Sequence, residues 1–350
     1  MSSLDVGVVG AGIGGLSTAI NIQRLIRRVK VTILADSFGR DTSTPVTPWV
    51  FLPIPTCIRG LDSTTASEWL TDSWRHHYQM ADSPEGWESG QCFMSGHYLW
   101  SQAPFEAHKV MSTLVKEYHL LSEQEMEDNN FNHRQACRLT TVVVDQIKYL
   151  QWLMREFRQR GGHVVCDTVY SLQELYGQFD VVVNCVGRRG RETVQDPYLV
   201  PVKGYVVQVE HECPKSFLIT DDPITVIPHA ESNMVDVGHI LEADVYSQEK
   251  NQELVDLLLN KVKALVPSLM GSTVIESYVS RRQYRSPPLV KIEMVRCGGP
   301  ILPVVHNIGL GLETVTLAWG MGAQAAHLVQ DVLRLSKPFP HLCQPFNTLA

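Results

Sequence analysis

Near its N-terminus the chain reads Val6-Gly7-Val8-Val9-Gly10-Ala11-Gly12-Ile13-Gly14-Gly15-Leu16. The β-branched first half of this stretch predicts a buried strand, and a helix-like segment follows from residue 16 to residue 28. Gly10 permits a tight turn, and Gly12 keeps a Cβ away from any ligand that approaches the backbone. Gly15 lets the helix pack close to the strand. We therefore expect a strand, a glycine loop and a helix in succession.

A second apolar run, Val31–Ala35, follows this helix and ends at Asp36. A carboxylate about 20 residues past the last glycine is placed to accept hydrogen bonds from ribose hydroxyls. The phosphates of the same ligand would meet the helix N-terminus, where backbone N–H groups favour negative charge. Glycines also mark ordinary turns, so the prediction of a dinucleotide depends on this strand, helix and acid context. The motif does not separate FAD from NAD.

The composition is that of a globular enzyme. The 350 residues suggest two domains, with 44% hydrophobic and 19% charged residues. A net charge of −7 argues against a nucleic-acid partner, because such a partner calls for a basic surface. No apolar run approaches the ~20 residues of a membrane span. The first strand begins so early that we expect no signal or transit peptide.

The cysteines and the last residues bear on the compartment. The 8 cysteines are far apart and form no C-x-x-C pair, so we expect reduced thiols, with neither disulfides nor a metal site. The C-terminal residues Asn347–Ala350 do not have the Ser-Lys-Leu pattern that addresses proteins to peroxisomes. We expect a cytoplasmic protein.

The rest of the chain shows two kinds of pattern. Residues 145–160 predict an amphipathic helix, and residues 180–187 predict a strand that is covered on both faces because it is apolar throughout. Residues 205–245 contain short strands with polar breaks, which indicates an antiparallel sheet. Near the end, a strand, a glycine loop and a helix from residue 316 to residue 335 return to the first pattern. The two domains are therefore expected to be interleaved in sequence.

Three further stretches add to the glycine loop. They are Tyr149-Leu150-Gln151-Trp152-Leu153, Val183-Asn184-Cys185-Val186-Gly187 and Leu302-Pro303-Val304-Val305-His306-Asn307. Together with the loop they resemble the D-amino-acid oxidase and D-aspartate oxidase family of FAD enzymes, in register over nearly the whole chain. The resemblance implies an α/β fold, with a Rossmann-like FAD-binding domain and an interleaved antiparallel-sheet substrate domain. The FAD-binding domain would comprise residues 1–55, 140–190 and 295–350, and the substrate-binding domain residues 56–139 and 191–294.

The reaction that the resemblance implies is oxidative deamination. A D-amino acid would lose its α-hydrogen as hydride to the flavin, and the imino acid would hydrolyse to a 2-oxo acid and ammonia. O2 would reoxidise the flavin and give H2O2. The partners are then a small D-amino acid and O2, and the resemblance also allows a homodimer.

The resemblance also assigns residues to the cofactor. The pyrophosphate, ribose and adenosine positions and those beside the isoalloxazine ring would be Gly10, Ala11, Gly12, Ile13, Gly15, Asp36, Ser37, Ser43, Thr44, Val169, Val186, Gly309, Gly311, Leu312 and Thr316. The hydroxyls of Ser43 and Thr44 could instead simply satisfy the loop backbone.

The arginine that anchors the substrate carboxylate in the family matches Arg282. The guanidinium fork binds a carboxylate through two parallel hydrogen bonds. The alternative is a surface pair formed with Arg281. Arg285 matches a second family arginine that is either structural or near the site. The catalytic positions implied are Arg282, Gly311 and Leu312, and Thr225 would contact the substrate.

The sequence departs from the family at the active site. Residues 222–228 contain no tyrosine, and Thr225 stands where the nearer lid tyrosine is expected. The last glycine loop reads Leu310-Gly311-Leu312 and is followed by Glu313, close to where a substrate amine would lie. The segment expected to back the flavin, Thr47–Val50, is bulkier than usual.

The departures leave two hypotheses. One is an active oxidase of D-amino acids. The other is a catalytically impaired, flavin-binding or flavin-free member with a structural or regulatory role. An NAD-dependent dehydrogenase would leave the matches in the C-terminal half unexplained. Neutral and acidic substrates both stay open. Leu241 replaces the basic residue of D-aspartate oxidases, whereas spare cations are His229, His239, Arg281 and Arg285.

Overall fold

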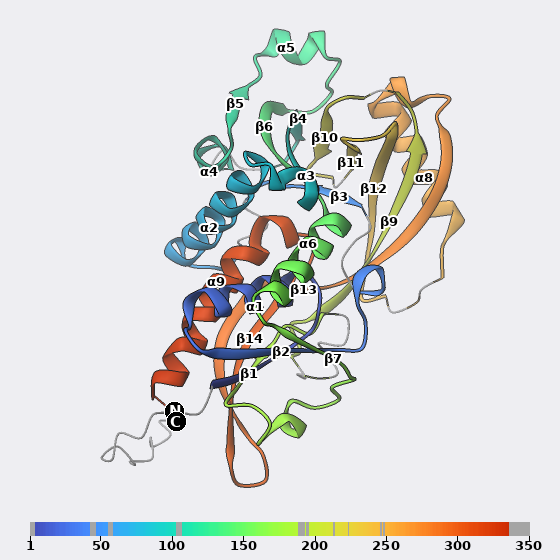
Figure 1. Cartoon of the computed structure of the whole chain (residues 1–350). Helices are drawn as coiled ribbons and strands as arrows, with labels where there is room; N and C mark the ends of the chain where they lie inside the picture. Colours follow the sequence, from blue (N-terminus) through green and yellow to red (C-terminus); the bar gives the residue numbers. More distant parts are fainter. Residues whose placement is uncertain are drawn as a thin grey trace, which may run out of the picture.

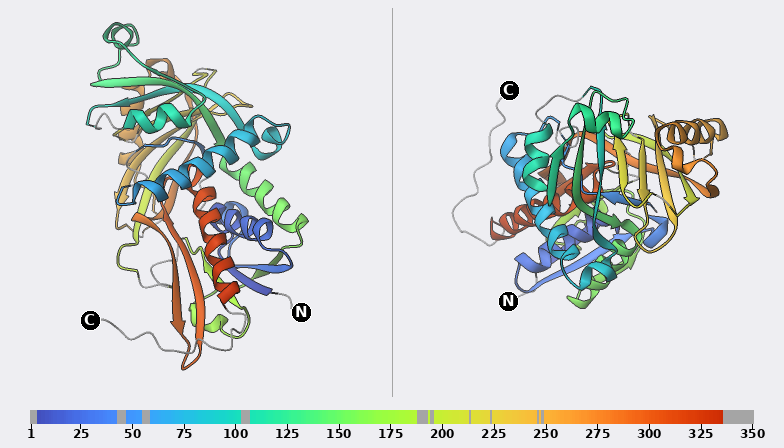
Figure 2. Two further views of the ribbon diagram at one scale, coloured as in Figure 1. Left: turned by 90° about the vertical axis from the view of Figure 1, so that its left-hand side faces the viewer. Right: turned by 90° about the horizontal axis from the view of Figure 1, so that it is seen from above.

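The computed structural model describes residues 4–42, 47–54, 59–102, 107–187, 193, 196–212, 214–222, 224–245, 247 and 249–335. Figures 1 and 2 show two parts that share long strands, with the helices of the N- and C-terminal segments gathered on one of them. All described strands belong to one continuous sheet.

One part holds a parallel sheet. Its strands, in spatial order, are β14 (Ile301–Leu310), β8 (Val181–Asn184), β1 (Leu4–Val9), β2 (Val29–Ala35) and β7 (His163–Cys166). Every neighbouring pair in this set is parallel. All four residues of β8 are fully buried, which confirms the predicted strand with two covered faces, although it is shorter than residues 180–187.

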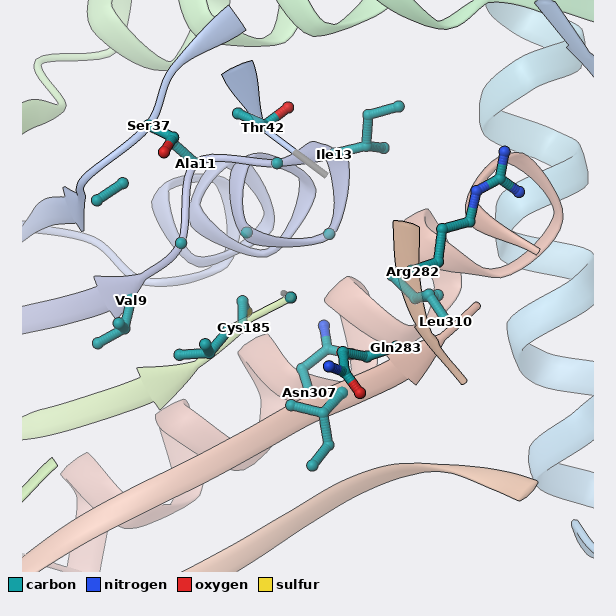
Figure 3. Close-up of a pocket in the computed structure, with 18 of the residues that line it drawn as sticks. Val9, Ala11, Ile13, Ser37, Thr42, Cys185, Arg282, Gln283, Asn307 and Leu310 are labelled. Carbon is teal, nitrogen blue, oxygen red and sulfur yellow. The ribbon is translucent and has the colours of Figure 1, made fainter. Parts of the chain in front are cut away.

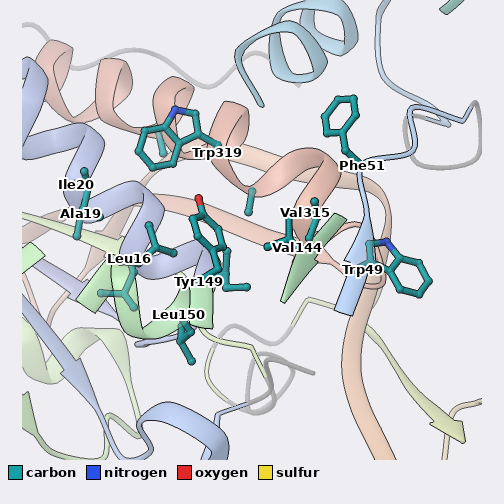
Figure 4. Packing of buried hydrophobic residues seen from close by; sticks show 14 of the residues in the cluster. Leu16, Ala19, Ile20, Trp49, Phe51, Val144, Tyr149, Leu150, Val315 and Trp319 are labelled. Atoms are coloured by element: carbon teal, nitrogen blue, oxygen red, sulfur yellow. The ribbon is translucent and has the colours of Figure 1, made fainter. Parts of the chain in front are cut away.

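Helices cover this parallel sheet. They are α1 (Ile13–Leu25), α6 (Gln146–Gln159) and α9 (Thr314–Leu335). Figure 4 shows apolar side chains of all three meeting in one core, among them Leu16, Ile20, Tyr149, Leu150 and Trp319. The helix α2 (Ser63–Ala81) crosses α9 closely, because a Cβ on Gly320 would lie 2.1 Å from the Trp69 carbonyl oxygen.

The other part is mainly antiparallel. In spatial order its strands are β3 (Pro48–Val50), β6 (Gln135–Asp145), β4 (Gln91–Trp100), β10 (Phe217–Thr220), β11 (Thr225–Pro228), β12 (Met234–Ala243) and β9 (Val200–Glu210), with β5 (Glu117–Leu120) paired to β6. The pair β4 and β10 is parallel, and the other pairs in this set are antiparallel. The antiparallel sheet predicted from residues 205–245 is confirmed.

One long strand, β13 (Thr273–Arg296), joins the two parts. Its first half pairs with β9, and its second half pairs with β14. The apolar pattern alone indicates two separate strands, at residues 274–279 and 289–294, because the residues between them are polar. That interpretation is wrong: backbone pairing continues through residues 280–284. The pairing with β14 shifts register between Tyr284 and Leu289.

The remaining described helices lie mostly at the surface. They are α3 (Glu85–Ser89), α4 (Ala107–Leu114), α5 (Glu123–Asp128) and α8 (Gln252–Leu265), with short 3-10 turns at Gly39–Asp41, Leu172–Leu175 and Pro267–Leu269. Ser122 and Glu125 form a capping box that starts α5.

Within the described residues, no helix is long and apolar enough to cross a membrane, and no cluster of His, Cys, Asp and Glu could hold a metal. The described thiols are free, namely Cys92, Cys137, Cys166, Cys185 and Cys297. Cys57, Cys213 and Cys343 lie outside the described residues. The predicted α/β fold is confirmed, whereas the predicted domain boundaries stay a prediction.

Candidate active site

A long cavity opens at the carboxyl ends of the parallel strands, where sheets of this kind bind ligands. Its walls come from the ends of β1, β2 and β14, the turn after β8, and two residues of β13. Figure 3 shows Ser37 and Arg282 at opposite ends of this cavity, with Ile13 between them. The cavity therefore runs from the glycine loop to the junction of the two parts.

The glycine loop is held tightly between β1 and the turn after β8. Gly10 has a φ of +113°, in the region that favours glycine. A Cβ on Gly10 would lie 2.5 Å from the Cys185 carbonyl oxygen, and a Cβ on Gly15 would lie 2.0 Å from the Gly10 carbonyl oxygen. Any side chain at either position would collide with backbone. Both glycines are thus required by the geometry.

The N-terminus of α1 faces the cavity. Gly12 is the N-cap residue, no side chain caps the helix, and the first turn contains no acidic residue. The N–H groups of a first helical turn have no partner inside the helix. Gly12, Ile13 and Gly14 line the cavity, so these donors and the positive end of the helix dipole are available to an anion.

The far end of the cavity, beyond β2, carries oxygen acceptors. Asp36, Ser37 and Asp167 all line it. Ser37 Oγ donates to Asp36 Oδ1 at 2.9 Å, and Asp167 Oδ1 accepts from the Thr168 N–H at 2.8 Å. Carboxylates accept hydrogen bonds from hydroxyl groups, so this end suits the ribose of a nucleotide.

A buried amide fixes the turn after β8. Asn184 Oδ1 accepts from the Val186 N–H at 3.1 Å, and Asn184 Nδ2 lies 3.0 Å from His306 Nδ1. Because Nδ1 then accepts, His306 Nε2 donates to Glu293 at 2.8 Å. The network connects β8 to β14 and holds Val186 at the cavity wall.

Arg282 lies at the other end of the cavity and is only 5% exposed. Its Nε, Nη1 and Nη2 atoms have no hydrogen-bond partner among the described residues. The Cζ atom lies 5.8 Å from the centre of the Trp49 ring. Burial lowers the pKa of Arg282 to about 10, so the side chain is still a cation at neutral pH. A buried cation without hydrogen bonds is unfavourable, and a bidentate carboxylate would satisfy it.

Glu313 is an acid beside this cation. It directly precedes α9, and its carbonyl oxygen accepts from the Leu317 N–H at 2.8 Å. Burial raises the pKa of Glu313 to about 7, while a hydrogen bond with Thr316 and the charge of Arg282 act in the opposite direction. Burial therefore favours the neutral form of this carboxyl group more than water would.

Most of the residues predicted for the site line the cavity. They are Gly10, Ala11, Gly12, Ile13, Gly15, Asp36, Ser37, Val169, Val186, Arg282, Gly309 and Gly311. Ser43 and Thr44 lie outside the described residues, although their neighbour Thr42 lines the cavity.

Four predicted residues lie elsewhere. Leu312 packs against the main core, and Thr316 is fully buried with its Oγ1 accepting from the Leu52 N–H at 3.3 Å. Thr225 is buried with its hydroxyl 3.4 Å from His239 Nδ1. Arg285 is held in an ion pair with Asp196 at 2.8 Å, which supports the structural alternative for this residue.

The sequence did not single out several lining residues. They include Thr42, Asp167, Gln283, Asn307 and Thr314. Gln283 and Asn307 are direct neighbours of predicted positions in the chain, so they could have been found from the motifs. Asp167 carries no sequence signal: parallel pairing of β7 with β2 brings it beside Asp36.

The sequence profile of the family described as "FAD dependent oxidoreductase" matches residues 5–328. The chain belongs to this family. The resemblance and the FAD cofactor that were predicted from the sequence are both confirmed.

Two relatives of this FAD-dependent oxidoreductase match over more than nine-tenths of its length. D-aspartate oxidase of Homo sapiens is 30% identical over 342 residues, which cover 97% of this chain and 99% of that protein. D-amino-acid oxidase of Rubrobacter xylanophilus is 28% identical over 336 residues, which cover 93% and 96%.

Solved structures share the fold of the oxidoreductase. Glycine oxidase from Geobacillus kaustophilus has a TM-score of 0.70 at 14% identity, covering 97% of this chain and 96% of that one. L-amino acid deaminase from Proteus vulgaris has a TM-score of 0.69 at 14% identity, covering 97% and 95%. At this identity the likeness shows the fold alone.

The lining residues fit FAD. The glycine loop has no room for a side chain at Gly10 or Gly15, the uncapped start of α1 offers donors to a pyrophosphate, and Asp36 offers acceptors to a ribose. The bulky Trp49 was expected to back the flavin. It is 7% exposed, and its ring packs edge-on against His239 at 5.3 Å rather than lining the cavity.

Proposed function

We propose that this oxidoreductase catalyses the oxidative deamination of D-amino acids to 2-oxo acid, ammonia and H2O2. The observation that carries the proposal is Arg282, a buried cation at the end of the FAD cavity whose donors all lack partners among the described residues. A substrate carboxylate would supply those partners. The names of the two relatives, D-aspartate oxidase and D-amino-acid oxidase, support the reaction class.

The roles follow from the positions of the side chains. Bound FAD supplies the redox chemistry, as hydride acceptor from the substrate and electron donor to O2. Arg282 holds the carboxylate in two parallel hydrogen bonds, and this fixes the direction of the Cα–H bond as well as the position of the substrate. Thr314, at the start of α9, lines the cavity, so the positive end of that helix faces the reacting region.

The substrate that fits best has a neutral side chain. Of the cations that could receive a second carboxylate, Arg285 is paired with Asp196 at 2.8 Å and His229 with Asp236 at 3.1 Å. The position expected to be basic in a D-aspartate oxidase is Leu241. A second buried carboxylate without a counterion would be strongly unfavourable.

A second candidate function is flavin binding with weakened catalysis. It is favoured by the charge interaction between Glu313 and Arg282, because an ionised Glu313 would compete with a substrate carboxylate for the cation. Residues 222–228 also provide no tyrosine to cover the substrate.

Purified protein loaded with FAD distinguishes the two. H2O2 and 2-oxo acid should form in equal amounts from neutral D-amino acids and not from their L-enantiomers. A flavin-loaded protein that is inert to every D-amino acid would overturn the proposed activity and leave the second candidate.

A further inference from the structure

We propose that His239 is the residue that selects the substrate side chain, and that it favours D-amino acids with a short, neutral, hydrogen-bonding side chain such as that of D-asparagine. This inference rests on the proposed function. It adds a second recognition point to the carboxylate anchor at Arg282.

His239 is a buried side chain with an unused nitrogen. It is 3% exposed, and its Nε2 atom has no hydrogen-bond partner among the described residues. Its Nδ1 atom lies 3.4 Å from the Thr225 hydroxyl, a long contact that leaves Nε2 as the stronger site for a partner. A buried polar atom of this kind is unfavourable unless something pairs with it.

His239 lies outside the regular pairing of β12 with β9. The pairing of β12 with β9 shifts register between Gly238 and Ile240, so His239 lies in a bulge. Bulges often re-aim a side chain next to an active site. On the facing strand, a Cβ at Gly204 would lie 3.4 Å from His239 Cδ2, in contact with the ring.

The ring of Trp49 lies next to both His239 and Arg282. The imidazole centre of His239 lies 5.3 Å from the centre of the Trp49 ring, and Cζ of Arg282 lies 5.8 Å from it. The charge of Arg282 also contributes to a lowered pKa of His239. Arg282 and His239 thus lie around one ring, and in the proposed complex the substrate side chain extends from Arg282 toward His239.

The chemistry of this subsite is neutral. Burial, together with the charge of Arg282, lowers the pKa of His239 to about 3, so the imidazole carries no charge at neutral pH. It can pair with a carboxamide in either tautomer, because an amide offers both a donor and an acceptor. A carboxylate would meet no charge on His239, and an apolar side chain would leave Nε2 unpaired.

The test compares two substrates of similar shape, D-asparagine and D-leucine. The FAD-loaded protein should prefer D-asparagine in kcat/KM by about 10-fold or more, because a site built for a hydrogen bond discriminates against an analogue that lacks it. His239→Leu should lower this preference by about 10- to 100-fold, mainly through KM for D-asparagine. His239→Gln, whose amide can reach the Nε2 position, should restore part of it.

A matched control is His97→Leu on β4, where the ring packs against Phe131 at 5.3 Å, and it should leave the preference unchanged. Equal or better turnover of D-leucine by the unmodified protein would overturn the inference. So would a preference that survives in His239→Leu.

Ligand binding separates this inference from the proposed function. Succinamate and 4-methylpentanoate lack the amine and are not oxidised, and their binding can be followed by the visible absorption of the bound flavin. The unmodified protein should bind succinamate more tightly, and His239→Leu should lose that difference. This holds even if no D-amino acid is turned over, in which case the proposed activity alone fails. Equal binding of the two ligands by the unmodified protein would refute the role of His239.

Discussion

At the scale of single residues, a buried guanidinium without hydrogen bonds is a feature that folding alone does not explain. Arg282 has this character, whereas the neighbouring Arg285 is neutralised by Asp196. Arg282 therefore has the character of a ligand-binding arginine, whereas Arg285 has a structural role. Register with the family singled out Arg282 from the sequence, and its side chain lines the cavity, whereas its role toward a substrate stays a prediction.

Arg282→Ala should lower kcat/KM for D-amino acids by about 100- to 1000-fold, since it removes a charge-assisted bidentate contact. Most of the loss should be in KM, because the carboxylate is bound before the reaction as well as during it. Steady-state peroxide assays measure both parameters. Arg281→Ala, one residue away, is the matched control with a small expected effect, and equal losses in both variants would contradict the assignment.

Glu313 makes stability depend on pH. Its pKa is raised from 4.5 to about 7 in the folded protein, so between these values the folded state keeps a proton that the unfolded state has lost. The contribution of Glu313 to stability is therefore greatest below pH 4.5 and falls by up to about 3 kcal/mol as pH rises through 7.

Glu313→Gln removes this titration. The free energy of unfolding of the variant, relative to the unmodified protein, should rise between pH 5 and pH 8, as measured by urea denaturation at each pH. A difference that is independent of pH would show that Glu313 titrates normally.

At the scale of elements, the loop before α1 and the long strand β13 show what a sequence can and cannot predict. The loop was predictable because Gly10 and Gly15 are each required by a backbone contact, and such requirements leave glycines at fixed spacing. The polar middle of β13 hides its continuity, because residues 280–284 are held in the strand by pairing with the distant strand β9, which periodicity cannot detect. The bulge at His239 was equally invisible, since it depends on the pairing of β12 with β9.

Gly15→Ala should destabilise the protein by about 3 kcal/mol or more and reduce its FAD content, because the new Cβ would lie 2.0 Å from the Gly10 carbonyl oxygen. Gly14→Ala is the control in the same helix. There the new Cβ meets only the end of the Leu310 side chain at 2.9 Å, which can move. Thermal unfolding compares the stability of the two variants, and the flavin-to-protein absorbance ratio reports the FAD content of Gly15→Ala. Equal destabilisation by the two substitutions would show that the contact at Gly15 is not required.

At the scale of the whole molecule, β13 links the cofactor region and the substrate region within one sheet. The α/β class and its interleaving were predictable, since the first and last segments share one pattern and the middle another. The sequence did not predict that β13 pairs with β9 and with β14 in one sheet. It also did not predict that Asp167 lines the cavity. Both depend on pairings between segments far apart in the chain.

Because the two regions share strands, the protein should unfold in one cooperative transition, and FAD should raise its midpoint. A ligand present at 1000 times its Kd adds about 4 kcal/mol to stability. Differential scanning calorimetry with increasing FAD measures the shift. Two separate transitions, of which FAD moves only one, would show that the regions fold independently.

The central step of the proposed function is that a D-amino acid binds Arg282 and reduces the bound flavin. The most direct measurement is the anaerobic mixing of the FAD-loaded protein with D-asparagine or L-asparagine, followed at the visible flavin band. We expect the D-enantiomer to bleach the band, and the L-enantiomer to leave it unchanged. A band that neither enantiomer bleaches, nor any other D-amino acid, would contradict the account.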